Sequence, residues 1–473
     1  MNVIYQIARM EDSKKIFCIS FEEGDCEREK FEKESSLSSF VVRDYFKDSK
    51  QENSEAVIFY PVSIVLNERL LKNLKTNVKY SNNTELINKL ENVFEKPTEY
   101  LKNPKDVIKL FPFEEEKDDY LVLSSFGTYL NNIEVKGSYS DIVLTILADM
   151  VTRYLHKDVT SFYIDISSGY NFYISALLEA ARHFSVFATL YNWDNKEKIP
   201  KVYTVFTDPI LGNNVSKYNV YVEQQHYLAF FNSPVNKEDV CQNDLKFIKD
   251  SIYTKKELRK NKNSLRTKLL KFSFLYSAIK NNLPLYIIDS FLECHKEEEI
   301  KEEIIDLMKF IIIEIENKGY ECSPNLNKSA FVKSLLSLAL YRGILTSLKN
   351  TFEKINIANF KADGVDMEVI RNVFEEVYIN FNMESNYKLL SSEINNLLKN
   401  KSKIDDNNQW VPLWKIIGEK SEGEIDQRNF FAHCGMERNV VDLKKSTDKI
   451  WIKYNNYFSS RKGNIENWIK EKI

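Results

Sequence analysis

A polar cluster near the C-terminus has the residue types that RNA cleavage requires. The stretch RNFFAHCGMERN (428–439) places Arg428, Asn429 and His433 close together. An imidazole titrates near neutral pH, so it can take the proton of a 2′-hydroxyl or protonate a leaving 5′-oxygen. An arginine can grip a phosphate while charge builds on it, and an asparagine can hold the imidazole or the phosphate. This chemistry needs no metal ion, and we expect no metal ligand among these residues.

The same stretch predicts a short helix that begins near Gln427, with Asp426 or Glu424 as its N-cap. Asn429 and His433 are four residues apart and would share one face of that helix. Helix geometry puts Arg428 about 140° round from His433. The spacing alone leaves a second interpretation open, a core helix packed by its two phenylalanines whose histidine has no catalytic role.

Length and composition bound the class of protein. A chain of 473 residues is too long for one ordinary core and predicts two or three domains. A net charge of −3 excludes a general basic coat, so any contact with nucleic acid must be local. The six cysteines form no C-x-x-C pair and indicate reduced thiols. No signal peptide or long apolar run is present, so we expect a cytoplasmic protein without a membrane partner.

The N-terminal half alternates short apolar runs with amphipathic stretches. This alternation predicts a Rossmann-like α/β domain with a mostly parallel sheet. The expected strands are 2–8, 16–21, 56–61, 120–126, 161–167, 186–192 and 201–207. The expected helices between them are 82–94, 140–155 and 171–184.

Such sheets bind ligands beyond the carboxyl ends of their strands. The turn at Ser167–Asn171 runs straight into a helix, where free backbone N–H groups suit a phosphate, and Asn171 could reach a base edge or a 2′-hydroxyl. An ordinary capped turn is the alternative. No G-x-G-x-x-G or P-loop motif is present. The candidate ligand-binding residues are Ala8, Arg9, Met10, Ser63, Gly127, Thr128, Ser167, Ser168, Gly169 and Asn171.

The C-terminal half changes to a period of 3.6 residues and predicts an all-α domain. The expected helices are 265–282, 297–319, 329–345 and 367–381. Gly319 is the expected C-cap of the second of these helices. The predicted domains are therefore 1–212, a polar connector at 213–255, and 256–473.

These motifs together resemble the CARF–HEPN ribonucleases that accompany type III CRISPR systems, the Csx/Csm accessory group. Arg428, Asn429 and His433 match the HEPN signature R-x4-6-H, and the string continues as Ala-His-x-Gly-x-Glu. Four N-terminal segments resemble CARF motifs: YPVSIV (60–65), FGTY (126–129), DISSGYN (165–171) and TDPI (207–210). One departure is the loop at 9–12, Arg-Met-Glu-Asp, where the family often has Trp-Gly-Asp.

The resemblance implies an allosteric antiviral enzyme without a cofactor. Two protomers would bind a cyclic oligoadenylate on their two-fold axis, so a homodimer or an assembly of dimers is expected. Cyclic tetra-adenylate is the expected activator, and cyclic hexa-adenylate stays open. Both copies of Arg428, Asn429 and His433 would then cut single-stranded RNA, leaving a 2′,3′-cyclic phosphate and a 5′-hydroxyl.

Two other functions stay open at this point. One is a toxin-like HEPN ribonuclease that does not depend on oligoadenylate. The other is a ligand-responsive CARF transcription regulator, which would need a basic helix to read DNA. The segment KKELRKNKNSLRTK (255–268) is basic enough to be that helix, or it could line the path of the RNA.

Overall fold

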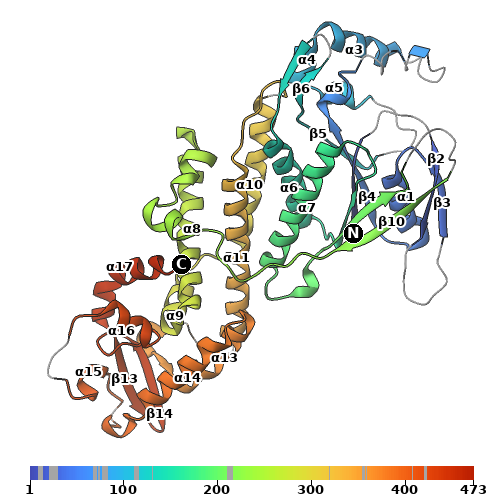
Figure 1. The fold of residues 1–473 in the computed structure, drawn as a ribbon. Coiled ribbons are helices and arrows are strands. Elements are labelled where there is room, and N and C mark those ends of the chain that lie inside the picture. Colours follow the sequence, from blue (N-terminus) through green and yellow to red (C-terminus); the bar gives the residue numbers. More distant parts are fainter. Residues whose placement is uncertain are drawn as a thin grey trace. The chain divides into compact units, whose positions relative to one another are not determined.

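The computed structural model divides the chain into two compact units, and Figure 1 colours the chain from blue at its N-terminus to red at its C-terminus. The first unit contains Met1–Ala188, Glu197–Leu228 and Ile305–Ser329, and the second contains Thr189–Lys196, Ala229–Ile304 and Ala330–Ile473. The structure describes residues 1–8, 14–20, 30–67, 72, 75–76, 84–110, 117–129, 132–209, 217–318, 320–353, 357, 360–406, 408–419 and 423–473.

The first unit is built on an eight-stranded sheet of order β3-β2-β10-β9-β8-β1-β4-β5. The run from β9 to β5 is parallel, β10 is parallel to β2, and the pairs β9–β10 and β2–β3 are antiparallel. The predicted mostly parallel sheet is confirmed. The strands are β1 (Asn2–Ile7), β2 (Lys15–Ser20), β3 (Lys30–Ser35), β4 (Ser54–Pro61), β5 (Asp119–Leu123), β8 (Ser161–Asp165), β9 (Lys201–Thr207) and β10 (Lys217–Gln225).

Helices cover both faces of this sheet. Successive side chains of a strand point to opposite faces, so two consecutive residues of β1 contact different helices. On one face Ile4 packs with Val41 and Val42 of α1 (Ser38–Asp44). On the other face Tyr5 donates a hydrogen bond of 2.5 Å to Asp149 of α6 (Tyr139–His156). Strands β1 and β8 are buried along their whole length, as their continuous apolar runs predict.

One predicted strand is wrong. Residues 186–192 form the end of α7 (Asn171–Tyr191), a helix of 21 residues. The apolar positions of this helix continue at helical spacing through Phe184, Phe187 and Ala188, which are all buried. A short apolar run inside a buried helix has the same composition as a buried strand, and periodicity over seven residues does not separate the two.

Shorter elements complete the first unit. Strands β6 (Phe126–Tyr129) and β7 (Ile133–Lys136) form a separate two-stranded sheet. Three helices follow β4 in the chain: α3 (Thr84–Glu95), α4 (Pro97–Lys102) and α5 (Lys105–Ile108). Strand β10 lies within the segment 213–255 that was expected to be a connector, and it pairs in the large sheet.

The second unit is mostly helical, as predicted. Its helices are α8 (Arg259–Lys280), α9 (Pro284–Leu292), α12 (Phe360–Asp363), α13 (Met367–Asn380), α14 (Glu384–Leu398), α15 (Leu413–Ile416), α16 (Gln427–Ala432) and α17 (Asn456–Glu471). It also holds a small antiparallel sheet of order β11-β14-β13-β12, which the sequence analysis did not predict. The strands of that sheet are β11 (Val365–Asp366), β12 (Val411–Pro412), β13 (Val441–Ser446) and β14 (Lys449–Tyr454).

Three long helices belong to both units. The division falls after Ala188 in α7, after Ile304 in α10 (Glu297–Lys318) and after Ser329 in α11 (Lys328–Phe352). The predicted C-cap Gly319 lies outside the described residues. Among the described residues, α11 alone is long and apolar enough to cross a membrane by length and composition. Most of its apolar stretch, 72%, is buried inside the structure, as in the core helix of a folded domain.

Candidate catalytic and ligand-binding sites

The helix that carries the polar cluster is α16, and Asp426 caps it. The Asp426 carboxylate accepts a hydrogen bond of 2.9 Å from the backbone N–H of Asn429. This side chain satisfies one of the N–H groups that a helix start leaves without an intrahelical partner. The predicted start at Gln427 and the predicted cap are therefore confirmed.

His433 lies at the C-cap, where the helix ends in a Schellman motif. The N–H of Gly435 donates to the carbonyl of Phe430 at 2.8 Å, and the N–H of Cys434 donates to that of Phe431 at 3.3 Å. This pair of bonds defines the motif and requires a left-handed residue after the cap. Cys434 takes that conformation at φ 53°, and Gly435 follows at φ 71°. A left-handed non-glycine residue costs on the order of 1 kcal/mol or more.

Buried neighbours hold this strained turn in place. Phe430 is fully buried, and its ring centroid lies 6.4 Å from that of Trp468 in α17. The Cys434 thiol is also buried and accepts a hydrogen bond of 3.2 Å from the side chain of Asn282. Burial raises the pKa of Cys434 to about 12, so the thiol is not a nucleophile at neutral pH.

The turn presents the imidazole of His433 half exposed, at 49%. Its Nδ1 lies 3.1 Å from the Oε1 atom of Glu393 in α14. Glu393 is only 15% exposed, so the carboxylate sits beneath the imidazole rather than in solvent. Sequence reasoning missed Glu393, because no spacing rule links residues 40 positions apart.

Arg428 and Asn429 are both exposed at the start of α16. The N–H of His433 donates to the carbonyl of Asn429 at 3.0 Å, which is the last helical bond. The three predicted catalytic residues therefore share one short helix. Among the described residues, no hydrogen bond or ion pair engages the guanidinium of Arg428 or the side-chain amide of Asn429.

The end of the motif ties three segments of the second unit together. Glu437 is buried and accepts hydrogen bonds from the backbone and the side chain of Asn439, at 2.8 and 2.9 Å. Burial raises the pKa of the Glu437 carboxyl. Asn439 also accepts from the N–H of Gly423 at 3.0 Å and from the side chain of Asn455 at 2.9 Å. These bonds fix the chain before and after α16.

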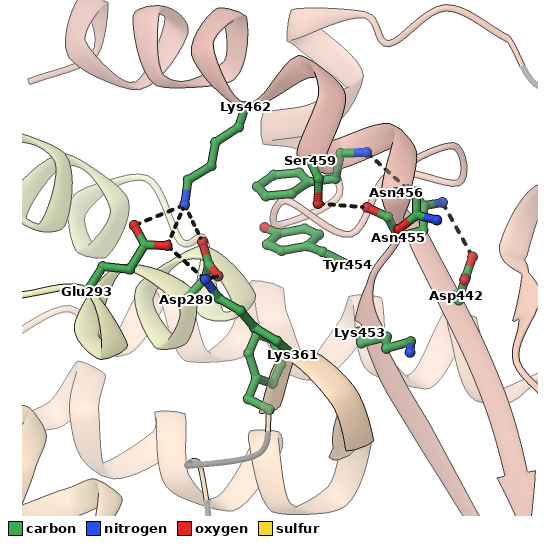
Figure 2. A pocket seen from close by; sticks show the side chains of 12 residues that line it. Asp289, Glu293, Lys361, Asp442, Lys453, Tyr454, Asn455, Asn456, Ser459 and Lys462 are labelled. Atoms are coloured by element: carbon green, nitrogen blue, oxygen red, sulfur yellow. Dashed lines mark hydrogen bonds and ion pairs between the residues drawn. The ribbon is translucent and has the colours of Figure 1, made fainter.

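A pocket of about 450 Å³ is lined by residues that include Asn455, which bonds to Asn439 (Figure 2). Lys462 is 2.8 Å from Asp289 and 3.1 Å from Glu293, and Lys361 is 2.8 Å from Glu293. Burial raises the pKa of Glu293, but hydrogen bonds from Lys361 and Lys462 outweigh it and hold this pKa at about 2. The charges are paired with one another, so the network ties α9 to α12 and α17.

In the first unit, Ser63 belongs to a chain of hydroxyl groups at the ends of two neighbouring strands. Ser63 follows β4, and its N–H and hydroxyl lie 3.0 and 2.9 Å from the hydroxyl of Ser125, which follows β5. The Tyr173 hydroxyl of α7 donates to Ser125 at 2.7 Å. Burial raises the pKa of Tyr173, so its hydroxyl keeps its proton at neutral pH. Of these three residues, the sequence pattern predicts only Ser63 as a ligand residue.

The buried carboxylate of Asp165 holds the turn between β8 and α7 in place. The Asp165 carboxylate accepts from the N–H of Ser167 at 2.9 Å and from the hydroxyl of Ser38 at 2.6 Å. Ser168 is buried, Gly169 is exposed at φ 80°, and Asn171 is exposed as the first residue of α7.

The remaining predicted ligand residues differ in what they expose. Gly127 and Thr128 are exposed on β6. Ala8 is fully buried, and its N–H donates to the carbonyl of Phe59 at 2.8 Å, so its side chain offers nothing to a ligand. Arg9 and Met10 lie outside the described residues.

A mostly parallel sheet with polar turns at its strand ends, followed by a helical region with an exposed Arg-Asn-His set, is the arrangement expected of a ligand-sensing nuclease. Comparison with family models gives two matches. Residues 5–209 match the CARF domain of the CRISPR system endoribonuclease Csx1, and residues 383–456 match its HEPN domain. Together the matches cover more than half of the chain. The chain belongs to this family, the CARF–HEPN ribonucleases that accompany CRISPR systems, and no curated protein matched it.

Gly435 provides a stability test of the turn that carries His433. A Cβ added there would lie 3.1 Å from the Tyr454 hydroxyl and 3.2 Å from Leu283, at a φ that disfavours any side chain. We expect Gly435→Ala to lower the free energy of unfolding by about 1–3 kcal/mol, measured by urea denaturation.

Gly463→Ala is the matched control for that measurement. Gly463 lies in α17 with nothing within 4 Å of an added Cβ. Alanine there should raise the free energy of unfolding by about 0.5–1 kcal/mol, because it is the better helix former. Equal effects of the two substitutions would contradict the close packing around the turn.

Proposed function

We propose that this chain is a metal-independent endoribonuclease that cuts single-stranded RNA when a cyclic oligoadenylate occupies its first unit. It would act in the cytoplasm, as a homodimer or an assembly of dimers, in type III CRISPR antiviral defence. The observation that carries the proposal is His433. Its imidazole is half exposed at the end of α16, its Nδ1 faces Glu393, and Arg428 and Asn429 lie on the same helix.

The chemistry follows from the free ring nitrogen. With the proton on Nδ1 directed at the carboxylate, Nε2 carries a lone pair and can take the proton of the 2′-hydroxyl. The 2′-oxygen then bonds to phosphorus while the bond from phosphorus to the 5′-oxygen breaks. The leaving 5′-oxygen takes a proton from His433 of the other protomer of a dimer, which begins the step in its protonated form. The products are a 2′,3′-cyclic phosphate and a 5′-hydroxyl, and no water is consumed.

The two exposed neighbours of His433 have complementary roles in this proposal. The guanidinium of Arg428 stabilises the charge that grows on the phosphate oxygens, and a rigid planar donor suits that task. The amide of Asn429 orients the phosphate from the turn of helix before His433. All three groups come from the protein itself, so cleavage should persist in EDTA.

The activator would bind where the first unit gathers its exposed polar turns. The N-terminus of α7 presents the N–H groups of its first turn and the positive end of a long helix dipole to a phosphate. Asn171, Ser63, Gly127 and Thr128 would contact the ring around it. Two copies of this surface related by a two-fold axis suit a symmetric ring such as cyclic tetra-adenylate, with cyclic hexa-adenylate as the alternative.

The structure does not favour the DNA-reading alternative. Within the basic segment 255–268, Arg266 is ion-paired with Asp244. Lys268 is buried and lies 2.8 Å from the buried carboxylate of Glu303. Two of the cations that a recognition helix would offer to phosphates are therefore engaged within the second unit.

Removal of His433 tests the catalytic assignment. We expect His433→Ala to slow cleavage of a labelled single-stranded RNA by roughly 100-fold to 10,000-fold, because proton transfer is lost. The assay is run in EDTA, with and without cyclic tetra-adenylate.

His156→Ala is the control, because His156 is exposed at the end of α6. This variant should cleave RNA at the wild-type rate. Wild-type rates in His433→Ala would remove the catalytic assignment. Cleavage by wild type that ignores the ring would instead favour the toxin-like ribonuclease.

Asn171→Ala tests the activator site. The loss of one hydrogen bond to the ring should raise the activator concentration for half-maximal rate by about tenfold, which corresponds to about 1.4 kcal/mol. The maximal rate at saturating ring should stay unchanged, because the nuclease residues are untouched. An unchanged half-maximal concentration would exclude Asn171 from the site.

A further inference from the structure

The carboxylate beneath the catalytic imidazole is held by a packed helix. Leu390, Ile394 and Leu397 bury one side of α14, which fixes the position of Glu393 between them. Among the described residues, the imidazole of His433 is the only group that hydrogen-bonds or ion-pairs with Glu393. A half-exposed imidazole above a carboxylate with no lysine or arginine partner indicates a role in the reaction rather than a structural ion pair.

We propose that Glu393 is a positioning residue for His433. By accepting the Nδ1 proton, the carboxylate fixes the tautomer and the ring orientation, so that Nε2 faces the RNA. This inference rests on the proposed function, because it assigns a role within that reaction. It also explains why a glutamate of α14 is kept largely out of solvent.

Two substitutions separate the hydrogen bond from the mere presence of a side chain. Glu393→Ala removes the acceptor and should lower kcat about 10-fold to 100-fold, as the loss of the hydrogen-bond partner of a functional histidine does elsewhere. KM for the RNA and the half-maximal ring concentration should not change. Glu393→Gln keeps an oxygen that can accept from Nδ1 and should restore most of the rate.

The control is Glu384→Ala, at the exposed start of the same helix, which should behave as wild type. Equal losses in Glu393→Ala and Glu393→Gln would overturn the positioning role, and so would a wild-type kcat in Glu393→Ala. A wild-type protein that cleaves no RNA would instead contradict the proposed function itself.

An independent set of contacts concerns residues 320–328, the loop between α10 and α11 with the first residue of α11. We call this segment the clasp, and it belongs to the first unit. The N–H of Lys136 donates to Glu321 at 3.1 Å, and the N–H of Ser323 donates to Lys136 at 2.8 Å. The clasp therefore lies along β7, and β7 pairs with the strand that carries Gly127 and Thr128.

A buried carboxylate locks the clasp to the start of α6. Asp141 is fully buried and accepts hydrogen bonds from the Ser323 hydroxyl and, at 2.9 Å, from the N–H of Leu326. Gly137 lies between β7 and α6, and its N–H donates to the carbonyl of Ser125 at 2.8 Å. This bond links the start of α6 to the residue whose hydroxyl contacts Ser63 and Tyr173. Bonds to a buried charge are costly to leave unmade, so these segments should move together.

The last residue of the clasp contacts α7, the helix that begins with the candidate ligand residue Asn171. Lys328 forms an ion pair with Glu179 of α7, and its ammonium lies 5.2 Å from the centre of the Tyr139 ring. Burial raises the pKa of Glu179, but the hydrogen bonds from Lys328 and Tyr139, together with the charges of Lys328 and His183, lower that pKa overall. Tyr139 packs on Phe172, whose ring is 4.1 Å from that of Phe126. These aromatic residues adjoin Asn171 and Gly127.

The geometry points to the clasp as the element that transmits ring occupancy to the nuclease. It contacts both β7 and α7, and it joins α10 and α11, whose other ends belong to the second unit. A ring that rearranges β6, β7 or the start of α7 must move the clasp or break its bonds. Helices of 22 and 25 residues then carry that displacement along the chain. This inference also rests on the proposed function.

The double variant Ser323→Ala/Lys328→Gln tests the clasp. We expect ring affinity within about threefold of wild type and an unchanged basal rate. The acceleration by the ring should fall at least tenfold, within the usual range of allosteric coupling. The control is Lys105→Gln/Glu316→Gln, which removes a 2.7 Å ion pair between α5 and α10, neither of which carries a candidate ligand residue. It should retain full activation.

A binding measurement removes any dependence on turnover. In a His433→Ala background, single-stranded RNA should change ring affinity, because coupling between binding sites is reciprocal. That change should vanish when the clasp substitutions are added. Full activation of the clasp variant would overturn the inference, and so would complete loss of ring binding, which would place the clasp in the binding site. A wild-type protein indifferent to the ring would contradict the proposed function.

Discussion

The left-handed turn at Cys434 and Gly435 is the constraint on which the candidate catalytic site depends. It stops α16 after Ala432, so that His433 caps the helix with its imidazole half in solvent, while Phe430 before it and Cys434 after it are buried. A non-glycine residue in that conformation costs free energy, and the buried Phe430 and the thiol contact with Asn282 offset it. The site is therefore a product of core packing.

Both candidate sites use buried polar groups to hold exposed ones. In the second unit, Glu437 and Asn439 satisfy each other and fix the segments around α16. In the first unit, Asp165 holds the turn that precedes α7, while Asp141 holds the clasp. Buried groups that are fully hydrogen-bonded specify one arrangement, because each alternative leaves a donor or acceptor unpaired. The exposed polar groups are thus presented by rigid supports, which suits a ring ligand and a phosphate.

Sequence patterns predicted the fold where they were long and regular, and failed where they were short. The alternation in the N-terminal half led to the mostly parallel sheet, and the 3.6 period led to the long helices. The apolar run 186–192 predicts a strand, although residues 186–191 end α7. Strands as short as β11 and β12, of two residues each, have too few positions for any periodicity. They form because β13 and β14 offer backbone partners in the folded second unit.

The sequence by itself determined what depends on near neighbours in the chain. The helix start near Gln427 with Asp426 or Glu424 as its cap, the placement of Arg428, Asn429 and His433 on one helix, and the family motifs all follow from spacings of a few residues. The tertiary structure alone decided which distant groups meet. Glu393 reaches His433 from another helix, and Asp141 meets Leu326 from 185 positions away. Helix and turn geometry fix relations over about one turn, whereas these contacts depend on how whole elements pack.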